Sequence, residues 1–175
     1  LYRMAIDGMP HLKYVGASSI AVDQIDVAYA KKKGIAITNI AGYSSNPIAE
    51  FVFGALLGHI RKLPLALENV EKNDFVVHPE YQCWELERKT FGILGLGNIG
   101  KRVGEIALGF GMDVQYYSRN RKTEYESKGF TFVDFEQLLQ TSDVLGIFLE
   151  LNNETKGIIT DKHVALIKKG TVAIS

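Results

Sequence analysis

Short apolar runs alternate along this chain with stretches in which apolar residues recur at helical spacing. The apolar runs predict strands over residues 13–15, 35–39, 91–94, 113–117, 144–149 and 171–175. The helical spacing predicts helices over residues 26–33, 47–63, 65–73, 99–110, 134–141 and 162–167. Because strands and helices alternate, we expect an α/β fold built on a doubly wound parallel sheet.

One predicted helix is apolar on almost every side. It is expected to begin near Pro47 and to be broken by Pro64, because proline cannot continue a helix. A helix without a polar face is typically buried between domains or subunits. Together with Leu63, Leu65 and Leu67, this helix offers more apolar surface than one small domain readily covers, which predicts a homodimer.

The glycine spacing G-x-G-x-x-G over residues 95–100 is the strongest sign of a binding site, because a predicted strand precedes it and a predicted helix follows it. Gly95 would permit the tight bend, Gly97 would let a pyrophosphate approach the backbone, and Gly100 would let the helix pack close to the strand. Free backbone N–H groups and the helix dipole would attract the phosphates. A glycine-rich turn that binds nothing is the alternative, and the flanking elements argue against it. The residues expected to bind a dinucleotide are therefore Gly95, Leu96, Gly97, Asn98, Ile99 and Gly100.

The end of the next predicted strand indicates which dinucleotide is bound. NAD-binding sheets of this type carry an acidic residue there that hydrogen-bonds the ribose 2′-hydroxyl, but this chain has Ser118. A carboxylate would repel the 2′-phosphate of NADP, whereas Ser118 can donate a hydrogen bond and the following Arg119, Asn120, Arg121 and Lys122 form a basic loop. The loop predicts NADP(H), with NAD as the alternative cofactor and an ordinary solvated basic loop as the alternative explanation of the charge.

Composition narrows the class of partner. The 20 basic and 20 acidic residues give a formal net charge of zero, so nothing indicates a nucleic acid or an anionic membrane as partner. The longest apolar stretch, residues 48–60, contains Glu50 and His59 and is too short to span a bilayer. A single cysteine, Cys83, excludes an internal disulfide and fits a reducing compartment. We expect a cytoplasmic protein that binds a small molecule and holds no metal.

Several ordered runs resemble the D-isomer-specific 2-hydroxyacid dehydrogenase family. The matching runs are residues 22–26, 30–35, 38–44, 48–50, 92–100, 142–144 and 153–155. Within that family, the sequence Tyr117-Ser118-Arg119 resembles the NADP-dependent glyoxylate and hydroxypyruvate reductases. The resemblance covers nearly the whole chain.

The resemblance implies a two-domain enzyme that exchanges a hydride between the nicotinamide and a small 2-oxo or 2-hydroxy acid such as glyoxylate or hydroxypyruvate. Residues 1–43 would be part of a flavodoxin-like substrate domain, and residues 44–175 an incomplete Rossmann cofactor domain. It also implies that Leu149, Glu150 and Thr155 contact the cofactor and that the loop Ser19, Ile20 and Ala21 receives the substrate.

No catalytic residue can be assigned within the chain. The chain has no initiator methionine and stops within an apolar run, so we expect a fragment of a longer protein. The family's catalytic arginine, glutamate and histidine would follow Ser175, and the chain alone is expected to be inactive. The histidines that are present, His11, His59, His78 and His163, lie elsewhere.

Two departures from the family pattern keep a second hypothesis open. The substrate loop is glycine-rich in the family, but here Ala21 restricts the backbone. Phe148 and Glu150 stand where the family usually has histidine and proline, and Glu150 would bring a negative charge toward the cofactor. The alternative is a catalytically inactive dinucleotide-binding or corepressor-like member of the same fold.

Overall fold

The computed structural model describes residues 2–19, 22, 24–40, 42–76 and 79–175. By the density of their internal contacts, the residues form two compact units, Leu1–Tyr43 and Ser44–Ser175.

The first unit is a small α/β unit. Its elements are α1 (Arg3–Asp7), β1 (Tyr14–Ala17), α2 (Val27–Lys32) and β2 (Ala36–Asn39). The two strands pair in parallel, with Tyr14 opposite Ala36. Helix α2 begins where the Asp26 carboxylate accepts the Tyr29 backbone N–H at 2.9 Å, and the chain leaves it through Gly34, whose φ of +74° suits glycine.

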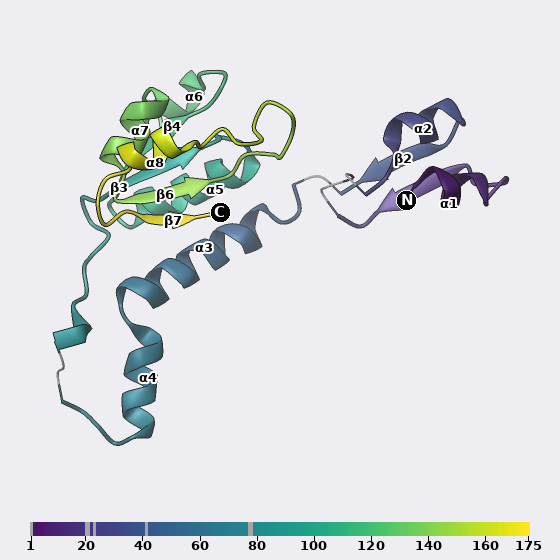
Figure 1. Ribbon diagram of the computed structural model, residues 1–175. Coiled ribbons are helices and arrows are strands. Elements are labelled where there is room, and N and C mark those ends of the chain that lie inside the picture. The colour runs from purple at the N-terminus through teal and green to yellow at the C-terminus, as the bar shows by residue number, and fades with distance from the viewer. Residues whose placement is uncertain (1, 20–21, 23, 41, 77–78) are drawn as a thin grey trace. The chain divides into compact units, whose positions relative to one another are not determined.

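The second unit contains the remaining elements, coloured from blue to yellow in Figure 1. They are α3 (Ser45–Ile60), α4 (Leu63–Glu71), the 3₁₀ turn η1 (Pro79–Tyr81), β3 (Thr90–Leu94), α5 (Asn98–Gly109), β4 (Asp113–Tyr117), α6 (Thr123–Glu126), β5 (Phe130–Phe132), α7 (Phe135–Thr141), β6 (Val144–Ile147), α8 (Asp161–Leu166) and β7 (Val172–Ile174). The five strands form one parallel sheet in the order β5-β4-β3-β6-β7. This order confirms the predicted doubly wound sheet.

Helices cover both faces of this sheet (Figure 1), because successive side chains of each buried strand point to opposite faces. On one face, Phe91 and Ile93 of β3 belong to a buried cluster with residues of α3 and α5. On the other face, Leu94 belongs to a cluster with Leu138 and Leu139 of α7. Both faces of β3 are therefore buried from solvent, in agreement with the unbroken apolar sequence of the strand.

The long apolar helix differs from the expectation in where it ends. Helix α3 ends at Ile60, and the chain turns at Lys62, which has a left-handed φ of 55°. Pro64 lies in the first turn of α4 and does not break α3, because a proline there lacks only an N–H that has no helical partner.

Besides the 3₁₀ turn η1, one strand and one helix of the second unit were not predicted. The strand β5 has only three residues, and α6 has only four. Such short segments carry too few positions for a period to show. β5 nevertheless extends the sheet, pairing Val114 of β4 with Phe130.

None of the helices in the part of the chain that the structure describes combines the length and the apolar character needed to cross a bilayer.

Candidate functional site

The candidate site lies at the carboxyl ends of β3, β4 and β6. The sheet extends from β3 toward β4 on one side and toward β6 on the other, so the strand order reverses between β3 and β6. Ligands of open parallel sheets bind outside the carboxyl ends of the strands at such a point. Backbone hydrogen bonds of 2.9 Å, from Gly95 N–H to the Tyr117 carbonyl and from Phe148 N–H to the Leu94 carbonyl, hold the three strand ends together.

Two glycines of the turn after β3 are required by the fold itself. Gly95 has a φ of +99°, and a Cβ added to it would lie 2.8 Å from Leu149 Cδ2 and 2.9 Å from the Phe148 carbonyl oxygen. A Cβ on Gly100 would lie 2.4 Å from the Gly95 carbonyl oxygen. These positions exclude any side chain, so they allow the tight bend and the close approach of α5 to β3.

The middle glycine has no such structural reason. Gly97 is the N-cap of α5, with φ −84° and ψ −165°, values that any residue adopts. A Cβ added to it would meet nothing within 4 Å in the described part of the chain. The first helical hydrogen bond runs from Lys101 N–H to the Gly97 carbonyl at 3.0 Å, and the N–H groups before it have no partner within the helix. This end of α5 therefore offers an open backbone surface and a positive dipole to an anion.

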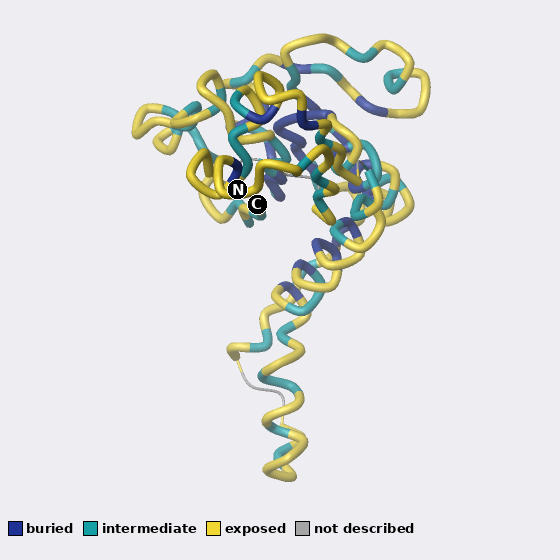
Figure 2. Tube along the Cα trace, turned by 90° about the vertical axis from the view of Figure 1, so that its right-hand side faces the viewer, coloured by how far each residue is buried: buried dark blue, intermediate teal, exposed yellow. Residues whose placement is uncertain are grey.

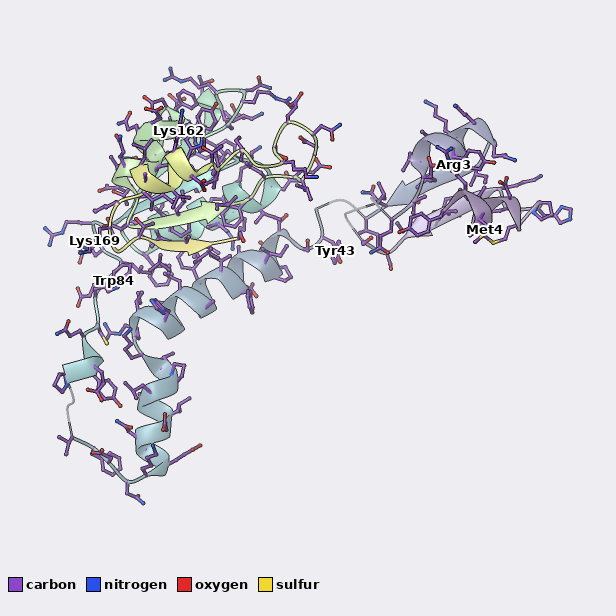
Figure 3. All side chains as sticks on the ribbon, in the orientation of Figure 1. Arg3, Met4, Tyr43, Trp84, Lys162 and Lys169 are labelled. Atoms are coloured by element: carbon purple, nitrogen blue, oxygen red, sulfur yellow. The ribbon has the colours of Figure 1, made fainter. Side chains whose placement is uncertain are left out.

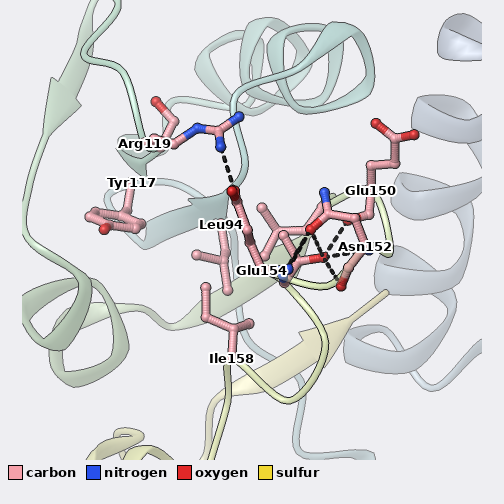
Figure 4. Close-up of a pocket in the computed structure, with 10 residues that line it drawn as sticks. Leu94, Tyr117, Arg119, Glu150, Asn152, Glu154 and Ile158 are labelled. Atoms are coloured by element: carbon pink, nitrogen blue, oxygen red, sulfur yellow. Dashed lines mark hydrogen bonds and ion pairs between the residues drawn. The ribbon is translucent and has the colours of Figure 1, made fainter.

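A cavity of about 410 Å³ opens beside this turn (Figure 4). The residues that line it are Leu94, Tyr117, Ser118, Arg119, Leu149, Glu150, Asn152, Glu154, Thr155 and Ile158. They come from the ends of β3 and β4 and from the segment between β6 and α8. The cavity thus has apolar walls and a few polar groups, which is the usual character of a small-molecule site.

An ion pair spans the cavity. The Arg119 Nη1 donates to the Glu154 carboxylate, and Figure 4 shows the two side chains pointing toward each other. Both side chains are exposed, with 78 % and 71 % of their surface accessible. Ser118 Oγ donates to the Asn120 carbonyl at 2.7 Å, which shapes the loop after β4.

Arg121 has a different partner and does not line the cavity. Its Nε and Nη2 donate to the two carboxylate oxygens of Glu126, each at 2.7 Å, and its guanidinium lies over the Phe132 ring. The Tyr116 hydroxyl also donates to Glu126, at 3.1 Å, and accepts the Lys122 N–H at 2.8 Å. The hydrogen bonds from Arg121 and then from Tyr116 keep the pKa of Glu126 below its usual range. Arg121 is therefore part of a network that holds the loop to β4.

The loop after β6 is held by its own hydrogen bonds. Asn152 Oδ1 accepts the N–H groups of Glu154 and Thr155 at 2.9 and 3.0 Å. The Thr155 hydroxyl donates to the Glu150 carbonyl. Figure 4 shows the Glu150 carboxylate directed away from Arg119 and Glu154, although the residue lines the cavity.

The predicted site residues fall into three groups. Those that line the cavity are Ser118, Arg119, Leu149, Glu150 and Thr155. Those that lie beside it without lining it are Gly95, Leu96, Gly97, Asn98, Ile99 and Gly100 of the turn, and Asn120 and Arg121 of the basic loop. Of the predicted substrate loop, Ser19 is exposed in the first unit, and Ile20 and Ala21 lie outside the described residues.

Sequence reasoning missed five lining residues. Two of them, Leu94 and Tyr117, are the last residues of β3 and β4. The other three, Asn152, Glu154 and Ile158, lie in the segment that follows β6, and the carboxyl end of a strand next to the point where the order reverses is a binding position. That rule could have pointed to them.

A second cavity, of about 180 Å³, lies at the opposite end of the sheet. It is lined by Trp84, Lys89, Asp143, Lys168, Lys169, Gly170 and Thr171, and Figure 3 shows Trp84 and Lys169 on this side of the sheet. Asp143 accepts the Lys168 Nζ at 2.7 Å and the Thr90 N–H at 2.9 Å. Burial alone would raise the pKa of Asp143, but these two donors lower it overall. The acid thus holds strand ends together at the amino edge, where this architecture does not bind its ligand.

Comparison with known proteins agrees with this geometry. The model of the D-isomer specific 2-hydroxyacid dehydrogenase NAD binding domain matches residues 53–175. The chain belongs to the D-isomer specific 2-hydroxyacid dehydrogenase family. This confirms the resemblance found in the sequence.

Relatives in this family carry different names. A glyoxylate reductase of Thermococcus litoralis is 35 % identical over 97 % of this chain and 54 % of its own length. The solved D-lactate dehydrogenase of Aquifex aeolicus, complexed with NAD and lactic acid, has a TM-score of 0.90 at 34 % identity, over 99 % of this chain and 52 % of its own. An acyclic imino acid reductase in complex with NADPH and D-arginine has a TM-score of 0.79 at 34 % identity, over 89 % of this chain and 50 % of its own. The chain spans about half the length of these family members.

Proposed function

We propose that the protein is an oxidoreductase that transfers a hydride between NADP(H) and a small 2-oxo or 2-hydroxy acid such as glyoxylate or hydroxypyruvate. The observation that carries the choice of NADP(H) is the position of Ser118 and Arg119, which line the cavity at the carboxyl end of β4. An NAD site of this fold places a carboxylate there to accept from the 2′-hydroxyl. A hydroxyl and a guanidinium at the same place suit a 2′-phosphate.

The residues present fit a dinucleotide. The open backbone at Gly97 and the first turn of α5 would receive the pyrophosphate, and the cavity between Ser118 and Thr155 would hold the adenosine half. When bound, the cofactor supplies or accepts the hydride. This chain's residues bind and orient it.

The relatives support the proposed reaction, but those with a bound cofactor differ in which dinucleotide it is. The glyoxylate reductase of Thermococcus litoralis supports a 2-oxo acid as substrate. The Aquifex aeolicus enzyme is complexed with NAD, whereas the imino acid reductase is complexed with NADPH. NAD is therefore the cofactor that the test has to exclude.

We assign the second unit, residues 44–175, to the cofactor and the first unit, residues 1–43, to part of a substrate domain whose loop Ser19, Ile20 and Ala21 receives the acid. The test is steady-state kinetics of the protein in its full natural length with glyoxylate and hydroxypyruvate, using NADPH and NADH in turn. A kcat/KM at least tenfold higher with NADPH supports the proposal. Equal or higher efficiency with NADH refutes the cofactor assignment.

A catalytically inactive dinucleotide-binding or corepressor-like protein is the second candidate, because Glu150 lines the cavity where its charge does not help a dinucleotide. Tight NADPH binding in a direct titration without turnover of any 2-oxo acid would favour this candidate. Measurable turnover would remove it.

We also propose that the protein is a homodimer. No residue of α4 is buried, as its teal and yellow trace in Figure 2 shows, and Leu67 and Val70 on it are 67 % and 55 % exposed. Phe51 on α3 is 75 % exposed. A second copy would cover such an apolar surface. Sedimentation should give a dimer for the natural protein and a monomer for Leu67→Glu, and a monomeric natural protein would contradict the proposal.

A further inference from the structure

Arg119 is the one cationic side chain among the described residues that line the cavity, and Glu154 forms an ion pair with it. Among the residues that line the cavity, the guanidinium of Arg119 pairs with the carboxylate of Glu154, whereas the Glu150 carboxylate points away from both. Arg121 is already bound through both nitrogens to Glu126, outside the cavity. The positive charge that this cavity offers to a 2′-phosphate is therefore that of Arg119, and in the structure Arg119 is paired with Glu154.

Glu154 is held in this position by its backbone. Asn152 Oδ1 accepts the N–H of Glu154 at 2.9 Å, and the Asn152 N–H donates to the Thr155 hydroxyl at 2.9 Å, so the turn presents Glu154 toward the end of β4. The two ends of the ion pair are 35 residues apart in the chain. Figure 4 shows the pair bridging the two loops that face each other across the cavity.

We infer that Glu154 is a specificity-determining residue that competes with the 2′-phosphate of NADP(H) for Arg119 and so limits the preference over NAD(H). This inference rests on the proposed function. To bind the phosphate, Arg119 must leave Glu154, and the phosphate must then tolerate the carboxylate nearby. NAD(H) has no group that needs Arg119, so its affinity is set by the glycine turn and the cavity walls.

The size of the effect follows from two contributions. Releasing an exposed ion pair costs about two- to fivefold in an equilibrium constant. Repulsion between the remaining carboxylate and a phosphate of about two negative charges costs about threefold in total at a separation of roughly 6 Å, once physiological salt screens it. Removing the charge of Glu154 should therefore tighten NADPH binding by about tenfold.

The experiment is a fluorescence titration of NADPH and NADH into the natural chain and into Glu154→Gln, which keeps the size of the side chain. We expect about tenfold tighter NADPH binding and less than a twofold change for NADH. Glu124→Gln is the matched control, because Glu124 is an exposed acid of the neighbouring α6 that does not line the cavity. It should change neither affinity by more than about twofold.

A double-mutant cycle shows whether the effect passes through Arg119. In the background of Arg119→Gln, the substitution of Glu154 should tighten NADPH binding by no more than about threefold, because only the direct repulsion remains. An equal gain in both backgrounds would overturn the competition.

The other outcomes are equally decisive. If the natural chain prefers NADPH but Glu154→Gln binds it no more tightly, the inference is wrong and the proposed function stands. Weaker NADPH binding by Glu154→Gln would also overturn the inference, because Glu154 would then hold Arg119 in place for the phosphate. If the natural chain binds neither dinucleotide, both the proposed function and the inference fall.

Discussion

Alanine substitutions at Gly97 and Gly100 should affect different properties, cofactor binding for Gly97 and stability for Gly100, although the two residues belong to one turn. A Cβ on Gly97 would meet no atom of the described residues within 4 Å, whereas a Cβ on Gly100 would lie 2.4 Å from the Gly95 carbonyl oxygen and 3.0 Å from Ile93 Cγ2. The first change fills space that the proposed pyrophosphate needs. The second forces apart a helix and a strand that are both part of the core.

For Gly97→Ala the free energy of unfolding should change by less than about 1 kcal/mol. The lower entropy of the unfolded chain stabilises the variant by about 0.4–1 kcal/mol, and alanine's poorer N-capping offsets this by a similar amount. The added methyl would keep the pyrophosphate from the backbone N–H groups, each worth about 1.5–3 kcal/mol to a charged acceptor. Loss of one such contact weakens NADPH binding by about ten- to hundredfold.

For Gly100→Ala the free energy of unfolding should fall by about 1–3 kcal/mol, because a backbone oxygen cannot move aside as a flexible side chain can. Urea unfolding measures the stability of each variant, and fluorescence titration with NADPH measures the affinity. Equal destabilisation of Gly97→Ala and Gly100→Ala would contradict the different roles of the two glycines, and so would NADPH binding by Gly97→Ala that matches the natural chain.

Two further predictions concern charged groups. Asp143→Asn should lower the free energy of unfolding at pH 7 by about 1–3 kcal/mol, since the carboxylate accepts from Lys168 and Thr90. The folded-state pKa of Asp143 is lowered, so the carboxylate contributes to the free energy of unfolding above the unfolded pKa of about 3.9, and this contribution is lost as the pH falls through the folded value. In urea unfolding from pH 7 to 2, the difference in stability between Asp143→Asn and the natural chain should vanish at low pH. A difference that stays constant with pH would contradict this. Arg121→Gln should weaken NADPH binding less than Arg119→Gln does in a fluorescence titration, because Arg121 is bound to Glu126 outside the cavity, and the reverse order would show that Arg121 turns toward the ligand.

The parts of this protein that the sequence predicted are those whose cause is local. A buried strand, three spaced glycines and an amphipathic helix follow one another directly, so the turn at residues 95–100 could be recognised without the rest of the fold. The position after β4 is also identified from its sequence neighbours alone, and it holds Ser118 where an NAD-binding sheet would have an acid. Helical and strand periods extend over enough residues in these elements to be distinguished.

Short strands and the exact ends of helices were harder to predict from the sequence. β5 consists of only three residues, Phe130–Phe132, and they take their extended conformation by pairing with β4. The end of α3 depends on the left-handed backbone of Lys62, a conformation that no residue preference of lysine predicts.

Which of the neighbouring charges face the cavity depends on the tertiary structure. Arg119 and Arg121 look alike in the sequence, but Glu126 binds Arg121, whereas Arg119 binds Glu154, which lies in the loop after β6 and 35 residues further along the chain. A side chain's partner depends on which loops the sheet brings together, and the strand order β4-β3-β6 places those two loops on either side of one site. The residues of the turn were therefore determined by the sequence alone, and the charge that a ligand meets there was determined by the fold.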